Sequence, residues 1–226
     1  MKESFRRKPE TKKDAKQRHL RAAASRVFSR KGYNGTSIRD ITDEADVSVG
    51  SFYSYFETKE DIIGKLYDEL AAKTLQIAVK VSSQEGDSSA KKFTRAMTHA
   101  ICVYVKNKEL SRIIFSKCTG INDSLEKRRA EILEKTRQYL AGVLGHLSAA
   151  HSLPMDDTDV LSVALTQSIF GFLSYWLDGK LAGDLEEAIR ALSEYHLRAL
   201  RIGFQDKSIR RYIHEIVAEE LKDPSN

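Results

Sequence analysis

The chain has only three prolines, and none of them lies between Pro9 and Pro154. Proline lacks a backbone N–H and ends or kinks a helix, so this long interval contains no obligatory helix breaker. Runs of Val, Ile and Thr bounded by turn residues, which would indicate strands, are sparse. We therefore predict an all-α fold. Its 226 residues, 41% of them hydrophobic, are enough for one or two buried cores.

Hydrophobic residues recur at helical spacing, and several of the predicted helices begin with an N-cap signal. In such a cap a side-chain oxygen accepts a hydrogen bond from the first free backbone N–H groups. The signals are Asp14-x-x-Gln17, Ser37-x-x-Asp40, Ser48, Thr58-x-x-Asp61 and Asp184-x-x-Glu187. Segment 75–81 also alternates like a strand, but the apolar stripe that continues through it favours a helix. Further helices are predicted at about 91–106, 109–118, 123–150, 156–180, 184–204 and 207–222.

The segment 48–61, SVGSFYSYFETKED, has four aromatic residues within five positions of a predicted short helix. Two short helices about four residues apart, after a supporting first helix, are typical of a helix-turn-helix, whose second helix enters the major groove of DNA. Phe52 and Phe56, four residues apart, are predicted to point into the core. Gly50 would allow a close approach to the bases, and Tyr53 would offer its ring and hydroxyl to DNA.

The stretch GYNGTSIRDITDEADVSVGSFYSYFETKEDII resembles the DNA-binding domain of the TetR family of bacterial transcriptional regulators, over residues 19–66. The resemblance implies a three-helix helix-turn-helix domain, followed by a larger helical ligand-binding and dimerisation domain. It also implies a homodimer that binds a palindromic operator in double-stranded DNA and acts as a repressor. The implied phosphate contacts are Thr36, Ser37, Ser48, Tyr53, Tyr55 and Lys59, and the implied base-edge contacts are Val49, Gly50, Ser51 and Arg39.

Two positions depart from the family pattern. Asp46 stands where the family usually has a turn glycine, and Asp tolerates the left-handed backbone conformation better than most residues. Val49 stands where the family often has Lys or Arg, so a direct hydrogen bond to a base is lost there. We expect sequence preference to depend on apolar contact or on the N-terminal arm.

Positive charge is concentrated at the N-terminus. Residues 1–21 contain nine Lys and Arg against three acidic residues, whereas the whole chain has a net charge of +5. We expect residues 1–13 to form a basic, flexible arm that suits a polyanion, either nucleic acid or an acidic membrane surface. A frayed, solvated terminus is the simpler explanation. The alternative class of protein is a helical small-molecule or partner-binding protein with such an arm.

After a helix-turn-helix domain at 14–60, we expect a ligand-binding and dimerisation domain at 61–204, then an extra amphipathic helix and tail at 205–226. Segment 156–180 is apolar nearly all round, but its polar residues favour a buried helix over a membrane span. Segment 184–204 has a seam of the kind that meets another helix, formed by Leu185, Ala188, Leu192, His196, Ala199 and Gly203. Two such helices per subunit would make a two-fold interface, and packing inside the monomer is the alternative.

Ligand contacts are predicted among aromatic and aliphatic residues between positions 93 and 176. They are Phe93, Met97, Ile101, Tyr104, Phe115, Tyr139, Phe172 and Tyr175, although core packing is the commoner role for any one of them. No Arg or Lys falls inside these apolar stripes, so we expect a small hydrophobic or amphipathic effector whose binding releases DNA.

The sequence shows no pattern of an enzyme or a metal site. Six histidines are scattered, and no Gly-rich phosphate loop, G-x-S-x-G or H-E-x-x-H occurs. Asp156, Asp157 and Asp159 form an acidic cluster that a helix start explains. Cys102 and Cys118 are typical of reduced thiols, and the N-terminus lacks the apolar region of a signal peptide. We therefore expect a cytoplasmic binding protein without cofactor or enzymatic activity.

Overall fold

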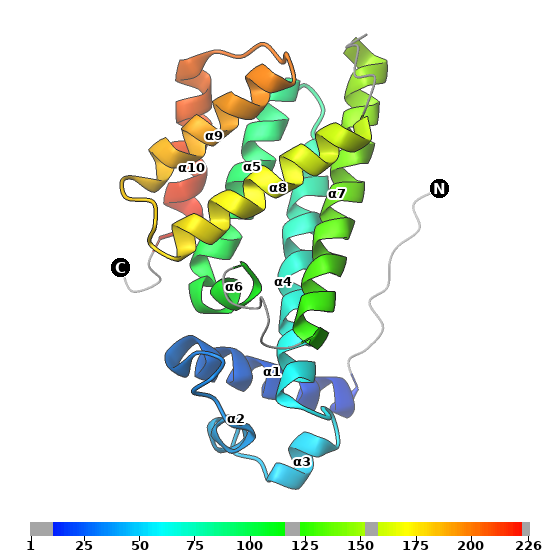
Figure 1. The fold of residues 1–226 in the computed structure, drawn as a ribbon, viewed down its shortest axis with the longest axis vertical. Coiled ribbons are helices and arrows are strands. Elements are labelled where there is room, and N and C mark those ends of the chain that lie inside the picture. The colour runs from blue at the N-terminus through cyan, green and yellow to red at the C-terminus, as the bar shows by residue number, and fades with distance from the viewer. Residues whose placement is uncertain (1–10, 116–122, 152–157, 223–226) are drawn as a thin grey trace. The chain divides into compact units, whose positions relative to one another are not determined.

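The computed structural model describes residues 11–115, 123–151 and 158–222, and these are helices joined by short connections (Figure 1). The described residues contain no β-strand, so the all-α prediction is confirmed. The helices are α1 (Lys12–Lys31), α2 (Ile38–Glu44), α3 (Val49–Tyr53), α4 (Lys59–Ser82), α5 (Ser89–Lys106), α6 (Lys108–Phe115), α7 (Asp123–His151), α8 (Thr158–Leu177), α9 (Leu185–Ala199) and α10 (Asp206–Glu220).

The chain divides into two compact units, Met1–Leu66 and Tyr67–Asn226. Some of the predictions above fall outside the described residues. They concern residues 1–10 of the basic arm, Cys118, Asp156, Asp157 and the tail 223–226.

The first unit has its core between α1 and the helix-turn-helix. Ala23, Ala24 and Phe28 of α1 are fully buried, as are Ile41 of α2 and Phe52 of α3. Residues three and four positions apart lie on the same side of a helix, so the buried residues of α1 form one apolar face. The small alanines of α1 let the short helices approach it closely.

Local capping sets where these helices begin. Ser37 and Asp40 form the predicted capping box of α2, and the Ser48 hydroxyl accepts a hydrogen bond from the Ser51 N–H at 3.1 Å. The predicted start of α1 is wrong: the capping box is Thr11 with Asp14, and Asp14 is its third helical residue. The Asp14 carboxylate accepts from the Thr11 N–H at 3.0 Å, while the Thr11 hydroxyl accepts from the Asp14 N–H at 3.1 Å.

The second unit is a layered bundle in which α8 packs against α6 and α7, while α5 packs against α9 and α10 (Figure 1). Segment 75–81 lies within α4, which confirms that it is helical. Asp184 caps α9 as predicted, its carboxylate accepting from the Glu187 N–H at 3.0 Å. Among the described helices, α8 alone is long and apolar enough to cross a membrane, with a mean hydropathy of 1.5. A helix that packs inside a protein core has the same composition.

The C-terminal helix α10 closes one side of α5. Ile209, Ile213 and Ile216 are its buried residues. Its last residue, Glu220, accepts hydrogen bonds from α5: the carboxylate lies 3.0 Å from His99 Nδ1, and the backbone oxygen lies 3.0 Å from Lys106 Nζ. The predicted amphipathic extension is therefore packed on the second unit.

Candidate functional site

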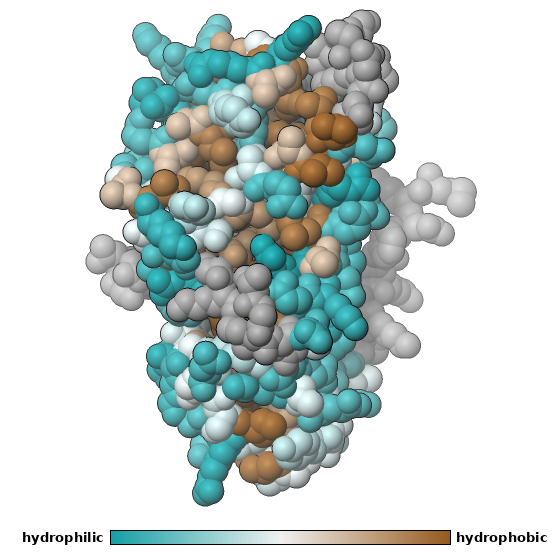
Figure 2. Space-filling view, viewed as in Figure 1, coloured by the Kyte–Doolittle hydropathy of each residue, from teal (hydrophilic) through white to brown (hydrophobic). Residues whose placement is uncertain are grey.

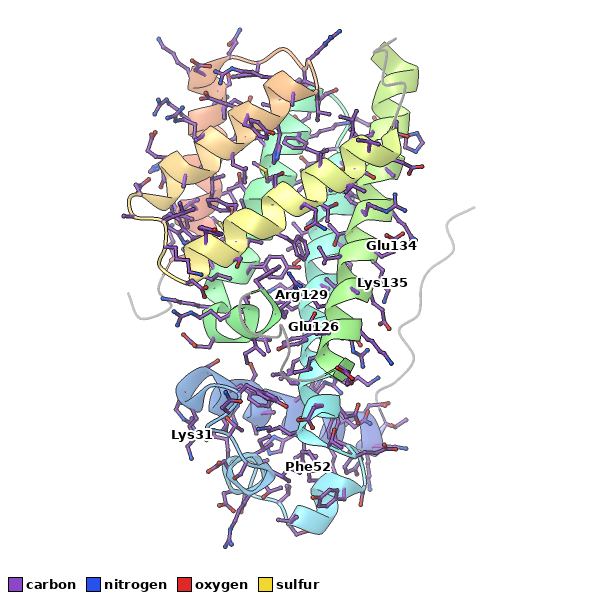
Figure 3. All side chains as sticks on the ribbon, in the orientation of Figure 1. Lys31, Phe52, Glu126, Arg129, Glu134 and Lys135 are labelled. Atoms are coloured by element: carbon purple, nitrogen blue, oxygen red, sulfur yellow. The ribbon has the colours of Figure 1, made fainter. Side chains whose placement is uncertain are left out.

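Helix α3 is held in the first unit by its two phenylalanines. Phe52 has none of its surface exposed, and Phe56 in the following turn has 2% exposed. Their ring centroids are 5.7 Å apart, and Phe52 (labelled in Figure 3) also meets the Tyr53 ring edge-on at 5.6 Å. The predicted anchoring role of Phe52 and Phe56 is confirmed, and it fixes which side of α3 points outward.

The outward side of α3 presents small and apolar groups. Val49 is 43% exposed and Tyr53 is 56% exposed; Gly50 between them and Ser48 just before them are also exposed. A Cβ added at Gly50 would meet only the Ser48 hydroxyl, at 3.9 Å, so the protein itself does not require a glycine there. Of the other predicted DNA contacts, Ser37 and Arg39 are exposed, and Ser51 and Tyr55 are partly exposed.

The turn before α3 uses a left-handed residue. Asp46 has a φ of 50°, which lies in the left-handed region of backbone conformation. This is the position where the family usually has a turn glycine. The Val47 N–H donates to the Thr42 carbonyl at 3.0 Å, which ends α2 and redirects the chain toward Ser48. The tolerance predicted for Asp46 is confirmed.

Thr36 and Lys59 are already used inside the domain. Thr36 is 3% exposed, and its hydroxyl donates to the Gly32 carbonyl at 2.6 Å. Lys59 Nζ donates to the carbonyls of Tyr33 and Thr36, at 2.9 Å each, and lies 4.1 Å from the centroid of the Tyr33 ring. The Thr36 hydroxyl proton is used inside the domain, and Lys59 keeps one N–H beyond its two hydrogen bonds. The phosphate contacts implied for these two residues stay predictions.

A second set of contacts, which sequence reasoning missed, joins α1 to α2. His19 Nε2 donates to the carbonyl of Ala45 at 2.9 Å, at the end of α2. Arg26 and Arg30 both pair with Glu44, and their hydrogen bonds hold the pKa of Glu44 at about 2. These partners are 14 to 26 residues apart in the chain, so no local motif signals them.

The predicted ligand residues of the second unit divide into three groups. Met97, Ile101, Tyr104 and Phe115 are at most 5% exposed. Tyr104 and Phe115 meet edge-on at 4.9 Å, which is close aromatic packing within the core. Phe93, Tyr139 and Phe172 are partly exposed. Tyr175 is 55% exposed on α8, and its ligand contact stays a prediction.

Two cavities are described in the second unit, and neither is lined by a predicted ligand residue. One, of about 210 Å³, lies between α5 and α10, with Lys91, Arg95 and Tyr212 in its lining. The other, of about 340 Å³, lies between α9 and α10, with Arg190 and Arg210 in its lining. Their charged walls differ from the apolar pocket expected for an effector. Within the described residues no group of three or more His, Cys, Asp or Glu is placed to hold a metal ion.

Helices α8 and α9 expose apolar side chains on the second unit. Val160, Val163 and Tyr175 of α8 are 61%, 46% and 55% exposed, and Tyr195 of α9 is 61% exposed. Figure 2 shows hydrophobic residues gathered on this face, over α8 and α9. Within the predicted seam of α9, His196 is 1% exposed and points inward, and its neighbour Tyr195 is on the outer face.

Comparison with known proteins agrees with this architecture. Residues 20–66 match the family described as bacterial regulatory proteins, tetR family. The chain is 22% identical to the HTH-type transcriptional regulator AcrR of Shigella flexneri, over 80% of this chain and 87% of the relative. A TetR-family transcriptional regulator from Syntrophomonas wolfei superposes with a TM-score of 0.71 and 21% identity, covering 84% of this chain and 97% of that chain. The regulator FadR from Bacillus subtilis, in complex with stearoyl-CoA, superposes with a TM-score of 0.65 and 21% identity, covering 83% and 99%.

Proposed function

We propose that the chain is a transcriptional regulator of the TetR family, and that it is a cytoplasmic repressor that binds a palindromic operator as a homodimer. We further propose that a small hydrophobic or amphipathic effector releases it from DNA. The observation that carries the proposal is the start of α3, where an exposed N-cap, a glycine and a tyrosine lie together on a helix anchored by buried phenylalanines.

This surface suits the major groove in its chemistry. The Ser48 hydroxyl and the free N–H groups of the first turn can hold a phosphate, as helix N-termini do. Gly50 lets the backbone come close to the base edges, and the exposed ring of Tyr53 can contact a thymine methyl. With Val49 in place of a basic residue, we propose that apolar contacts and Arg39 contribute to base preference.

The exposed apolar stripe of α8 and α9 supports a dimer. Val163 and Tyr195 have about half or more of their surface exposed, which is costly for large apolar groups unless another surface covers them. A two-fold interface covers both copies of such a stripe at once. Two reading heads related by this symmetry would bind half-sites about one helical turn apart, which makes the operator palindromic.

The second unit supports an effector of largely apolar character. Its predicted ligand residues are aromatic or aliphatic with no charged group among them, and four of the eight are buried. The structural neighbour FadR was solved with stearoyl-CoA, an amphipathic molecule with a long acyl chain. An effector of this kind would release DNA if it binds more tightly to the conformation with low operator affinity.

The test begins with an operator selected from random duplexes, followed by fluorescence anisotropy with wild type and Tyr53→Ala. We expect Tyr53→Ala to weaken operator binding by about tenfold or more, because one aromatic contact and one hydroxyl contact are lost. Tyr212→Phe, on α10 of the second unit and outside the stripe on α8 and α9, is the control. Stearoyl-CoA is then titrated into the operator complex, with free CoA as its control. Unchanged binding by Tyr53→Ala would contradict the role of α3, and tighter operator binding with stearoyl-CoA would reverse the proposed direction of control.

A further inference from the structure

His196 of α9 lies inside the second unit with 1% of its surface exposed. Its Nε2 is 2.6 Å from the hydroxyl of Ser168 on α8, and that hydroxyl is 2.9 Å from the backbone oxygen of Leu165. A carbonyl oxygen can only accept, so the Ser168 hydroxyl donates to Leu165 and accepts from His196. Because this arrangement satisfies both contacts, we assign the imidazole proton to Nε2, which leaves Nδ1 as an acceptor.

Nδ1 of His196 has no hydrogen-bond partner among the described residues. Burial lowers the pKa of His196 to about 4, so the ring is neutral near pH 7 and Nδ1 keeps its lone pair. Nearly all buried polar atoms in native proteins have a partner, which is protein, water or ligand. This atom therefore requires a partner from outside the described protein groups.

His196 lies beside an apolar cluster of the second unit. Phe93 of α5 meets its ring edge-on, with centroids 5.8 Å apart. Phe93 also packs against a buried cluster of Leu144, Leu165 and Leu200. Leu165 thus links the polar pair to this cluster, because its backbone oxygen accepts from Ser168. The apolar residues packed around the cluster are only partly buried, and they are Phe93, Leu140, Leu161 and Ile202.

We propose that the effector binds beside His196, next to the cluster of Leu144, Leu165 and Leu200. An apolar part of the ligand covers the partly buried side chains. A neutral hydroxyl or amide of the ligand donates a hydrogen bond to His196 Nδ1. The inference rests on the proposed function, since it names the effector class. A carboxylate would bring acceptors against an acceptor, and the neutral ring would not offset its charge. The site therefore favours a neutral donor attached to an apolar body.

The test uses three probes of similar size: 1-nonanol, 1-methoxyoctane and nonanoate. Calorimetry on the full chain should show that the alcohol binds at least about tenfold more tightly than the ether, which has no donor, and than the anion. In His196→Phe the alcohol and the ether should bind equally. His146→Phe, which changes an exposed histidine of α7, should keep the wild-type preference. Equal binding of alcohol and ether by the wild type, or no binding of either, would overturn the proposal.

A second measurement separates a ligand from a resident water. In ¹⁵N-histidine spectra of the full chain, the His196 resonance is identified as the one missing from His196→Phe. Adding 1-nonanol should shift the Nδ1 resonance and leave Nε2 protonated. A resonance that already shows a hydrogen bond and does not move would mean that a water occupies Nδ1, and the proposal would be wrong. Operator binding, and its release by stearoyl-CoA, are measured separately, so failure of this site is distinguishable from failure of the proposed function.

Discussion

Gly50 occupies the first turn of α3 without a contact inside the protein that demands a glycine. We predict that Gly50→Ala raises the free energy of unfolding by up to about 1 kcal/mol, because alanine loses less backbone entropy in a helix. The same methyl group should weaken operator binding about tenfold, because it keeps α3 away from the base edges. Urea unfolding and fluorescence anisotropy measure the two effects. An unchanged operator affinity would show that Gly50 does not approach the DNA.

Because His196 is buried, we predict that the free energy of unfolding depends on pH. Its pKa is about 4 in the folded chain, below the value of about 6.5 for an unperturbed histidine, so the unfolded chain binds this proton first as the pH falls. The free energy of unfolding should therefore fall from about pH 6.5 toward pH 4. In the upper part of this pH window the acidic residues change the free energy of unfolding little. Glu44 and Glu134, with pKa values of about 2, lose their stabilising effect only at lower pH.

Urea unfolding between pH 7 and pH 5 checks this dependence. His196→Phe should have a flatter profile than wild type, whatever its stability at pH 7, because it has no proton to take up at that position. His146→Phe should keep the wild-type slope, since residue 146 is exposed. Parallel profiles for wild type and His196→Phe would contradict the neutral, buried state of His196.

Among the elements, α10 shields α5. Cys102 of α5 has no exposed surface, and its burial, together with the nearby charge of Glu220, raises the pKa of the thiol to about 12. A thiol in this state reacts slowly, because the thiolate is the reactive form. Cys102 therefore reports whether α10 stays packed.

We predict that Ile213→Ala loosens α10. The lost side chain, 1% exposed in the wild type, should lower the free energy of unfolding by roughly 2–5 kcal/mol. In a Cys118→Ser background, the thiol of Cys102 should react with a disulfide reagent at least about tenfold faster than in the parent. Glu219→Ala on the exposed side of the same helix is the control. Equal thiol reactivity in both variants would mean that α10 does not cover Cys102.

At the scale of the whole molecule, the proposed function depends on pairing two copies. Val163 on α8 and Val79 on α4 are 46% and 50% exposed, so they form a matched pair for substitution by arginine. We predict that Val163→Arg converts the dimer to a monomer, because it would bury a charge in an apolar interface. The same substitution should weaken operator binding, because a monomer has a single reading head and contacts one half-site.

Val79→Arg should leave both the dimer and operator binding intact, because its position lies outside the stripe on α8 and α9. Sedimentation velocity measures the oligomeric state, and fluorescence anisotropy measures operator binding. Dissociation by Val79→Arg alone would place the interface on α4. Two unaffected dimers would exclude both helix faces as the interface.

Features that depend on neighbours within one helical turn could be predicted from the sequence. The caps at Ser37 and Ser48 join groups three residues apart, and the buried pair Phe52 and Phe56 is four residues apart. The pattern of residues around Gly50 and Tyr53 indicated a DNA-reading helix for the same reason. Such contacts form within one segment, so residue spacing alone specifies them.

Other features were decided by the tertiary structure. Lys59 is bound by carbonyls 23 and 26 residues earlier in the chain, and His19 reaches the end of α2. On α9 the spacing of apolar residues places His196 in a seam that meets another helix, and the fold decides that this residue packs inward against α8 while Tyr195 lies outside. Periodicity states which residues share a face of a helix. Which face meets which neighbour depends on how all the helices pack together, and that packing selects a buried histidine with one free acceptor.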